Sequence, residues 1–461
     1  MRVIKVISTF LIVLIIVGFI WSAFKVFPGV SGYGAKNMCS AIYLQNREPA
    51  DIIREDLNFF PVTLGTYSWD SNDSSTTGSV WGLANRKAIY RESCGCTLVN
   101  DFTETEIRNQ QINIPTPPNT DIDTIPWPYG DRITSKQLDF IDYDKLNSAV
   151  DEVMEEVTEN GKFADTRAVV VLYNGKMIAE RYADGYDQTT IMLGWSMSKT
   201  ITASIVGILV KKGMIDLDDP APVNEWKSSE KQKITLRQLL QQTSGINFLE
   251  NYERPSNVTR MLFSEGDMAA YAANLKLEHE PGTHFNYNSG NTNLLCRIIR
   301  KLLNEEDYYA FPYMELFYKI NAPSFLLEYD ASGTFVGSSY CYATARDYAR
   351  MGLLYYNNGI WNGEQILPMN WIEESVTPSM ADEYKQYGFQ LWLNGLNPNN
   401  TEQRQFPDVP KDMYYIDGYG GQRIFIIPSK KIVVVRLGLY PVDGNTFLKN
   451  VLDACKKKID T

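Results

Sequence analysis

One stretch of the sequence, residues 194–213, is nearly uncharged and rich in small and branched apolar residues. It ends with two lysines followed by Gly213, a pattern typical of the last turn and stop of a helix. The stretch therefore predicts a buried helix. Ser196 lies at its start and Lys199 follows three residues later, so on a helix the amine can reach the hydroxyl.

The same Ser-x-x-Lys spacing occurs at Ser22/Lys25 and at Ser228/Lys231. The first of these ends a hydrophobic N-terminal segment, and the second lies in a polar run typical of a solvated loop. Only Ser196 leads into a helix apolar enough to bury a lysine, and burial makes an amine a more useful base. A helix N-terminus also offers N–H groups to a developing oxyanion. The pattern favours a nucleophilic serine, with an ordinary helix-capping serine as the alternative.

The composition argues against several classes of function. The chain has 461 residues, a net charge of −11 and no basic cluster, so we do not expect nucleic-acid binding. Its 2 histidines, His279 and His284, are not part of an H-E-x-x-H or Cys-x-x-Cys grouping, so we expect no zinc site. Structural or surface roles are expected for both histidines.

The cysteines are too few, at 6, for a disulfide scaffold in a chain of this length. In an oxidising compartment the sequence allows one bridge among Cys39, Cys94 and Cys96. Cys296 and Cys455 fall within apolar helical patterns, which favours simple burial. A cysteine nucleophile is not expected, because none has a paired histidine nearby in the sequence.

The N-terminus holds two basic residues, then an uncharged run over 6–24, then Lys25. At about 1.5 Å per residue this run is long enough to cross the hydrocarbon core of a membrane. A cleaved signal peptide usually ends in small residues, whereas Trp21 stands at that place here. We therefore expect residues 1–25 to be a retained anchor, one transmembrane helix. Positive charge before the helix favours a body on the periplasmic or extracellular side.

The rest of the chain predicts an α+β fold. Residues 26–130 form an N-terminal extension that ends in a proline-rich linker, and residues 131–461 form the main domain. A strand hairpin is expected over 168–182, and two further strands over 422–427 and 432–437. We therefore expect an antiparallel sheet built from both chain ends and flanked by helices, with a helical insertion at about 214–340. The other segments indicate a loop at 68–78, strands at 88–99 and 387–393, and helices at 50–57, 142–159, 235–242, 267–275, 294–303, 343–356, 368–374 and 446–457.

Several motifs, in order, resemble those of the penicillin-recognising serine hydrolases. This family includes class C β-lactamases, D,D-peptidases, related esterases and 6-aminohexanoate-oligomer hydrolases. The motifs are W-S-M-S-K-T at 195–200, I-T-L-R-Q-L-L-Q-Q-T-S-G-I at 234–246, P-G-T-H-F-N-Y-N-S-G-N-T-N-L-L at 281–295, A-T-A-R-D-Y-A-R-M-G-L-L at 343–354 and Y-I-D-G-Y-G-G-Q at 415–422. In the N-terminal part, C-G-C-T-L and W-P-Y-G-D are similar more narrowly to the 6-aminohexanoate-hydrolase branch. The resemblance implies a β-lactamase/D,D-peptidase-like fold.

The resemblance also implies a mechanism without a metal or an organic cofactor. Ser196 is the nucleophile and Lys199 its partner, and Tyr287 matches the tyrosine of the second, Tyr-x-Asn motif. Either Lys199 or Tyr287 removes the serine proton, and an acyl-enzyme on Ser196 is released to water. A buried aromatic side chain is the alternative role of Tyr287.

Two motifs depart from the family pattern. Ser289 replaces the usual asparagine of the second motif, with Asn291 as a nearby substitute. The third motif, Lys-Thr-Gly in β-lactamases, is Tyr419-Gly-Gly here, so the cation that would hold a β-lactam carboxylate is missing, although Arg423 is close in the sequence. This departure argues against a dedicated β-lactamase.

The resemblance places an oxyanion-binding N–H at Ser196 and a second one on the C-terminal strand near Gln422. Gly420 and Gly421 let the backbone come close to the substrate. We therefore expect a serine hydrolase that cleaves an amide of a small peptide or an ω-amino acid oligomer. The alternatives are a carboxylic esterase, a D,D-peptidase and a non-catalytic envelope binding protein. The expected partners are a small substrate and, through the anchor, a membrane.

Overall fold

The computed structural model describes residues 2–119, 121–134, 137–158, 161 and 163–456. The chain divides into two compact units. The first comprises Met1–Gln111, Phe248–Asn274 and Glu328–Phe335, and the second comprises Ile112–Asn247, Leu275–Leu327 and Val336–Thr461. Two segments of the expected helical insertion therefore belong to the first unit. The domain boundaries expected at residues 25 and 130 remain predictions.

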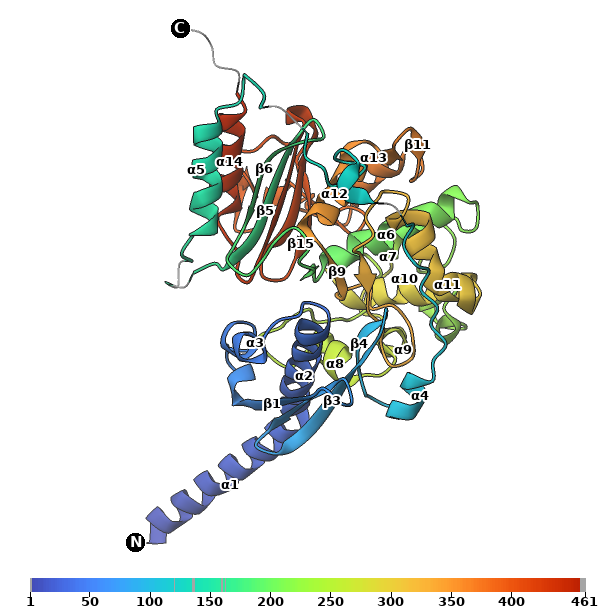
Figure 1. Ribbon diagram of the computed structural model, residues 1–461. Coiled ribbons are helices and arrows are strands. Elements are labelled where there is room, and N and C mark those ends of the chain that lie inside the picture. The colour runs from blue at the N-terminus through green and yellow to red at the C-terminus, as the bar shows by residue number, and fades with distance from the viewer. Residues whose placement is uncertain (1, 120, 135–136, 159–160, 162, 457–461) are drawn as a thin grey trace. The chain divides into compact units, whose positions relative to one another are not determined.

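The first unit begins with helix α1 (Arg2–Lys25), which projects from the unit in Figure 1. By length and composition, this N-terminal helical region is apolar enough to cross a membrane, a property that a signal sequence shares. Helix α2 (Phe27–Tyr43) follows directly, with Pro28 in its first turn. Proline suits this position, because the N–H groups of a first helical turn have no partner within the helix.

A four-stranded antiparallel sheet forms the rest of this unit's framework, in the order β1-β2-β3-β4. The strands are β1 (Gly65–Asp70), β2 (Ser75–Val80), β3 (Leu83–Arg91) and β4 (Gly95–Leu98). The loop expected at 68–78 is therefore wrong, because β1 and β2 pair in an unbroken register across it. Thr76 of β2 is buried and donates to the Ala35 carbonyl of α2 at 2.6 Å, which gives this polar strand a place against the helix. The unit also contains α3 (Pro49–Glu55), α4 (Glu104–Arg108), α8 (Asn257–Ser264) and α9 (Met268–Asn274).

A disulfide joins Cys39 of α2 to Cys96 of β4, while Cys94 is a buried thiol. Beside the disulfide, the buried Lys36 ammonium pairs with the Glu328 carboxylate. The same carboxylate accepts hydrogen bonds from Ser40 Oγ at 2.8 Å and from the Cys96 N–H at 2.7 Å. These bonds compensate the buried charge of the Glu328 carboxylate. Without partners, this charge would strongly destabilise the folded protein.

The second unit is built on a six-stranded sheet in the order β12-β15-β16-β17-β5-β6. The strands are β5 (Thr166–Tyr173), β6 (Lys176–Tyr182), β12 (Trp392–Leu393), β15 (Tyr414–Gly418), β16 (Gln422–Ile427) and β17 (Ile432–Gly438). All neighbouring pairs are antiparallel, and β17 pairs with β5 so that Val434 lies opposite Val171. The expected α+β fold, with a sheet built from distant parts of the chain, is confirmed. The strand expected at 387–393 shortens to β12, because Gln390 has a positive φ of 58°.

Helices cover both faces of this sheet. Helices α5 (Tyr143–Met154) and α14 (Gly444–Ala454) lie side by side on one face, as Figure 1 shows, and share a core with the sheet. Helix α12 (Ala345–Tyr356) packs on the other face, where Gly352 leaves room for Ile424 and Val433. The remaining helices and short strands are α6 (Met197–Lys211), α7 (Leu236–Leu240), α10 (Ser289–Leu302), α11 (Glu305–Pro312), α13 (Trp371–Ser375), β7 (Met192–Leu193), β8 (Leu326–Leu327), β9 (Cys341–Ala343), β10 (Ile360–Trp361), β11 (Glu364–Gln365), β13 (Leu396–Asn397) and β14 (Asn400–Arg404).

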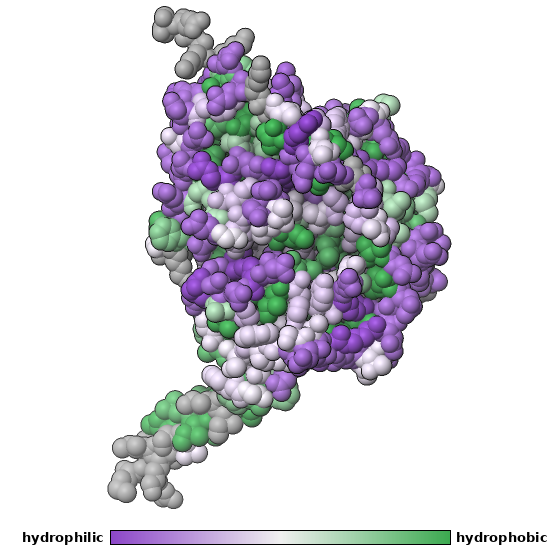
Figure 2. Space-filling model, in the orientation of Figure 1, coloured by the Kyte–Doolittle hydropathy of each residue, from purple (hydrophilic) through white to green (hydrophobic). Residues whose placement is uncertain are grey.

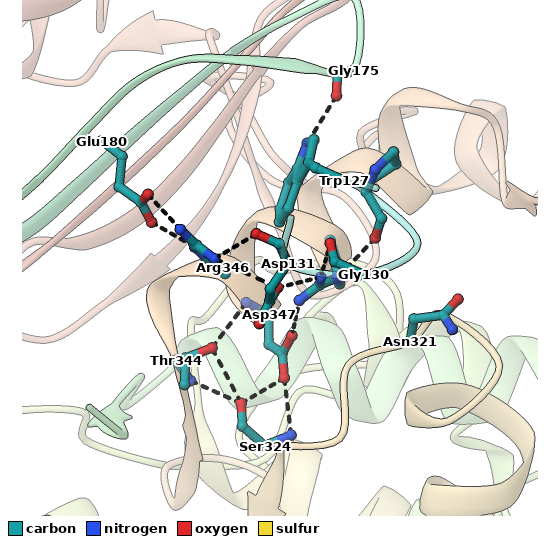
Figure 3. A network of polar contacts seen from close by, with 12 residues as sticks. Trp127, Gly130, Asp131, Gly175, Glu180, Asn321, Ser324, Thr344, Arg346 and Asp347 are labelled. Carbon is teal, nitrogen blue, oxygen red and sulfur yellow. Dashed lines mark hydrogen bonds and ion pairs between the residues drawn. The ribbon is translucent and has the colours of Figure 1, made fainter. Parts of the chain in front are cut away.

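A polar network fixes part of the proline-rich segment to helix α12 (Figure 3). Arg350 donates to the carbonyl of Gly130 at 2.8 Å and to the Asp131 carboxylate at 2.6 Å. Arg346 makes a two-pronged contact with Glu180 of β6, at 2.7 and 2.8 Å. Such forked contacts have a strict geometry. This end of the expected linker is therefore bound firmly to the second unit.

Candidate active site

Ser196 lies at the N-terminus of α6, in the second unit. It is the N-cap residue, yet its side chain makes no capping hydrogen bond with the described backbone. Instead, the preceding Trp195 adopts a positive φ of 48°, and the hydroxyl of Ser196 lies 2.9 Å from Lys199 Nζ. The geometry therefore does not fit the ordinary capping serine.

The backbone before Ser196 is tightly enclosed. A side chain at Gly194 would place its Cβ 2.4 Å from Tyr348 Oη. A side chain at Gly418, the last residue of β15, would place its Cβ 2.1 Å from the Gly194 carbonyl oxygen. Two glycines thus bring the end of β15 against the start of α6.

Lys199 is 1% exposed, and its ammonium nitrogen has three oxygen partners. Nζ lies 2.9 Å from Ser196 Oγ, 3.0 Å from Ser289 Oγ and 2.9 Å from the Ser338 carbonyl oxygen. A protonated lysine can donate to all three oxygens. A neutral amine keeps two donors and gains a lone pair, so it can accept the Ser196 proton without leaving its place.

Tyr287 lies next to this lysine, as expected. Lys199 Nζ is 4.9 Å from the centroid of the Tyr287 ring. The ring is held by aromatic contacts with Tyr387 and Trp392, at centroid distances of 5.7 and 5.3 Å. The structure therefore brings Ser196, Lys199 and Tyr287 together, although Tyr287 is distant from the other two in the sequence.

Ser289 and Asn291 have different roles in the structure. Helix α10 begins at Ser289, earlier than the expected start at 294, because Asn288 Oδ1 accepts a capping bond from the Asn291 N–H at 2.9 Å. The Asn291 side chain contacts Gln242 and Ser244, each at 2.8 Å. Asn291 therefore does not replace the missing asparagine of the second motif, and it is Ser289 that contacts Lys199.

The Gly420-Gly421 pair forms the turn between β15 and β16. Both glycines have positive φ, 77° and 79°, and a Cβ on either would lie within 3 Å of backbone atoms of residues 439–441. Gln422 follows at the start of β16 with a buried side chain. That side chain accepts from the Gly438 N–H at 3.0 Å and donates to the Tyr419 carbonyl at 3.2 Å, so it braces the turn.

Arg423 does not replace the missing cation of the third motif. Its Nε pairs with Asp417 at 2.7 Å, and its guanidinium lies over the rings of Tyr415 and Phe425. Both rings belong to the core that packs under α5 and α14. Since side chains alternate along a strand, Arg423 faces away from α6, on the opposite side from Gln422.

Arg436 of β17 is a residue that the motif pattern does not indicate. It is fully buried, and its Nη1 donates to the carbonyl oxygens of Gly420 and Gly421, each at 3.2 Å. Its Nη2 donates to Thr166 Oγ1 at 2.7 Å, and no ion pair among the described residues involves it. Burial, and next the charge of Arg423, lower the pKa of Arg436. A buried charge thus holds the carbonyls of the glycine turn.

We expect Arg436→Met to lower kcat by about 10-fold with little change in KM. The Gly421 carbonyl and the Gln422 N–H belong to one planar trans peptide and point in opposite directions. An arginine that holds the carbonyl therefore aims the N–H away from itself, and losing an aligned oxyanion donor costs about 10²–10³-fold. Steady-state kinetics on an activated ester provide the measurement.

Arg423→Met is the matched control, because Arg423 pairs with Arg436 in the β16–β17 register and lies on the same face of the sheet, but contacts Asp417 and aromatic rings instead of the glycine turn. Its kcat should stay near that of the unmodified protein. Equal kcat values for the two variants, with both folded, would contradict the role given to Arg436.

Aromatic side chains gather around Trp195, the residue before Ser196. Trp195 packs edge-on against Tyr419 at a centroid distance of 5.6 Å and lies 6.4 Å from Tyr340. Tyr419 is 46% exposed. By the motif resemblance, this tyrosine takes the place of the third-motif lysine of β-lactamases.

The two histidines lie elsewhere. Both are exposed, and their rings are 4.2 Å apart. Among the described residues, no group of three or more His, Cys, Asp and Glu side chains is arranged to hold a metal ion.

The chain is similar to known proteins of one family. The family model described as beta-lactamase matches residues 150–438. A 6-aminohexanoate-dimer hydrolase of Paenarthrobacter ureafaciens is 25% identical over 291 residues, 60% of this chain and 73% of that protein. A solved structure of a candidate 6-aminohexanoate-dimer hydrolase from Bacillus anthracis has a TM-score of 0.56 and 23% identity, and covers 70% of this chain and 86% of that one. The hydrolase EstCE1 has a TM-score of 0.52 and 14% identity, with 68% and 98% covered.

Proposed function

The chain belongs to the beta-lactamase family and is a serine hydrolase, and from this premise we propose that it cleaves an amide through an acyl-enzyme on Ser196. The observation that carries the proposal is the 2.9 Å contact between Lys199 Nζ and Ser196 Oγ at the start of α6. A buried amine at this distance can take the serine proton. The proposed substrates are amides of small peptides or of ω-amino acid oligomers.

The proposed reaction has two steps. In acylation, Ser196 Oγ loses its proton to the Lys199–Tyr287 pair and bonds to the substrate carbonyl carbon, and the amine leaves with a proton from the same pair. The N–H groups of Ser196 and Gln422 are proposed to bind the oxyanion. In deacylation, water loses a proton to the pair and attacks the ester carbon, which releases the acid and restores Ser196.

Two observations bear on the substrate: one favours an amide of an amino acid oligomer, and the other argues against a β-lactam. The curated relative from Paenarthrobacter ureafaciens is named a 6-aminohexanoate-dimer hydrolase. The exposed Tyr419 and the inward-packed Arg423 leave the third motif without a cation for a β-lactam carboxylate. A carboxylic ester is the second candidate, because the fold is shared with EstCE1, a hydrolase with promiscuous acyltransferase activity.

We further propose that α1 anchors the protein in a membrane, with both units on the periplasmic or extracellular side. The apolar length of the N-terminal helix supports the anchor. The Cys39–Cys96 disulfide supports the placement of both units on the outer side of the membrane, because such bonds persist in oxidising compartments.

Labelling of the full-length protein with a fluorophosphonate probe tests the proposal. We expect one labelled peptide, and mass spectrometry should place the adduct on Ser196. Hydrolysis of 6-aminohexanoate oligomers, p-nitrophenyl esters and D-Ala-D-Ala peptides then separates amidase, esterase and D,D-peptidase. Absence of both labelling and ester hydrolysis would favour a non-catalytic envelope binding protein instead.

A further inference from the structure

The turn between β2 and β3 carries an unusual residue. Val80 pairs with Leu83, so Trp81 and Gly82 form a two-residue turn in which both have positive φ, 51° and 75°. Turns of this kind favour Asn-Gly or Asp-Gly. A bulky tryptophan at positive φ is a backbone outlier. Such outliers gather at positions where the side chain has a function.

The Trp81 side chain lies against the apolar N-terminal helix. Its ring stacks on Phe19 of α1 at a centroid distance of 6.0 Å and an interplanar angle of 3°. Its edge packs against Phe27 of α2 at 5.5 Å. Despite these two contacts, Trp81 is 62% exposed and its neighbour Leu83 is 42% exposed. The turn therefore continues the apolar surface of α1.

The position of Phe19 along α1 gives the depth in the membrane at which the β2–β3 turn would lie. The uncharged run ends at Phe24 and is followed by Lys25, and Phe19 lies five residues before that end. At 1.5 Å per residue this distance is about 7.5 Å. Trp21 is exposed in the same part of the helix, and Figure 2 shows hydrophobic residues gathered along the described part of α1. Tryptophan is enriched at this level of a membrane, where headgroups meet acyl chains.

We propose that the β2–β3 turn enters the interface of the lipid bilayer that α1 crosses, with Trp81 and Leu83 in contact with lipid. Lipid is the partner that we infer, because Trp81 is stacked on a residue of the proposed membrane helix itself. The inference rests on the proposed anchor and is independent of the hydrolase activity. Two attachments, one helical and one at the turn, hold the first unit in one orientation on the membrane.

Site-specific labelling of the full-length protein in lipid nanodiscs tests this proposal. The single substitutions Leu83→Cys, Ile12→Cys and Trp69→Cys would each carry an NBD fluorophore, with signal from the native cysteines subtracted. Ile12 lies about 18 Å along α1 from Phe24, near the bilayer centre, so lipids with a deep nitroxide report insertion of α1 there. Trp69 is an exposed control at the other end of the sheet, because it pairs with Thr76 near the β1–β2 turn. We expect lipids with a shallow nitroxide to quench the Leu83 label at least ~3-fold more than the Trp69 label.

Each outcome bears on the proposal. Quenching at Ile12 with a Leu83 label that matches the Trp69 label would overturn the membrane contact of the turn and leave the anchor intact. Lack of quenching at Ile12 would overturn both. Trp81→Asn should reduce quenching at Leu83 to the Trp69 level, and it keeps the fold because Asn-Gly suits this turn. Hydrolysis of a soluble ester by the same samples should be unchanged, which separates this test from the proposed catalysis.

Discussion

Ser196→Ala is expected to lower kcat/KM by on the order of 10⁵-fold and to abolish labelling by a fluorophosphonate. The change removes the oxygen that would form the acyl-enzyme, while the neighbouring backbone keeps its conformation because Ser196 makes no capping bond through its side chain with the described backbone. Any residual rate would come from substrate binding and oxyanion contacts alone. Hydrolysis of a p-nitrophenyl ester, followed with enough enzyme to detect slow turnover, measures the loss.

Ser228→Ala is the matched control for this experiment. Ser228 has the same spacing to a lysine, Lys231, but it is exposed and lies in a turn with a φ of 64°. Its replacement should leave the rate and the labelling unchanged. A Ser196→Ala protein that folds and still turns over at a rate near normal would remove Ser196 from the mechanism.

The main elements around the site were predictable from local pattern. The run 194–213 is apolar around the whole helix, and α6 is accordingly buried over most of its length. The β5–β6 hairpin follows from alternating strands around Asn174-Gly175, where both residues have positive φ. In each case the signal lies within one continuous stretch of the sequence.

Elements whose stability depends on distant partners were not predictable in this way. The polar run at 68–78 forms a strand pair because β1 and β2 find partners and Thr76 bonds to α2. The first turn of α10 is polar, and only the capping bond of Asn288 shows that the helix starts at Ser289. Tertiary context outweighs intrinsic propensity in the strand pair, whereas at α10 a local capping bond outweighs the polar pattern of the first turn.

The residues of the candidate site likewise differ in whether the local sequence predicts them. The Ser196–Lys199 pair follows from helix geometry, whereas the nearness of Tyr287 came only from the family resemblance. The Arg436 guanidinium donates to the Gly421 carbonyl, and the Ser338 carbonyl accepts from Lys199. Each contact pairs a side chain with a backbone oxygen of a distant segment, and no spacing in the sequence marks it. The choice of Cys39–Cys96 over its alternatives likewise needed the pairing of α2 with β4.

Lys199→Met is expected to lower kcat by about 10³-fold, because it removes the group proposed to take and return the serine proton. Methionine is close to lysine in length and suits a buried position. The oxygens of Ser196, Ser289 and Ser338 would lose a shared partner, so the thermal midpoint should be measured beside the kinetics.

The control is Lys212→Met at the other end of the same helix, where the amine is partly exposed and pairs with Glu315 at 2.9 Å. Exposed pairs of this kind contribute about 0–1 kcal/mol, so this variant should keep its rate and nearly all its stability.

Tyr287→Phe in the Lys199→Met background identifies the base. If the lysine and the tyrosine act as one proton-transferring pair, the double variant should be little slower than Lys199→Met alone, because groups that act as a unit are not additive. A folded Lys199→Met protein with a normal kcat would show that the tyrosine, or another group, activates Ser196 without the lysine.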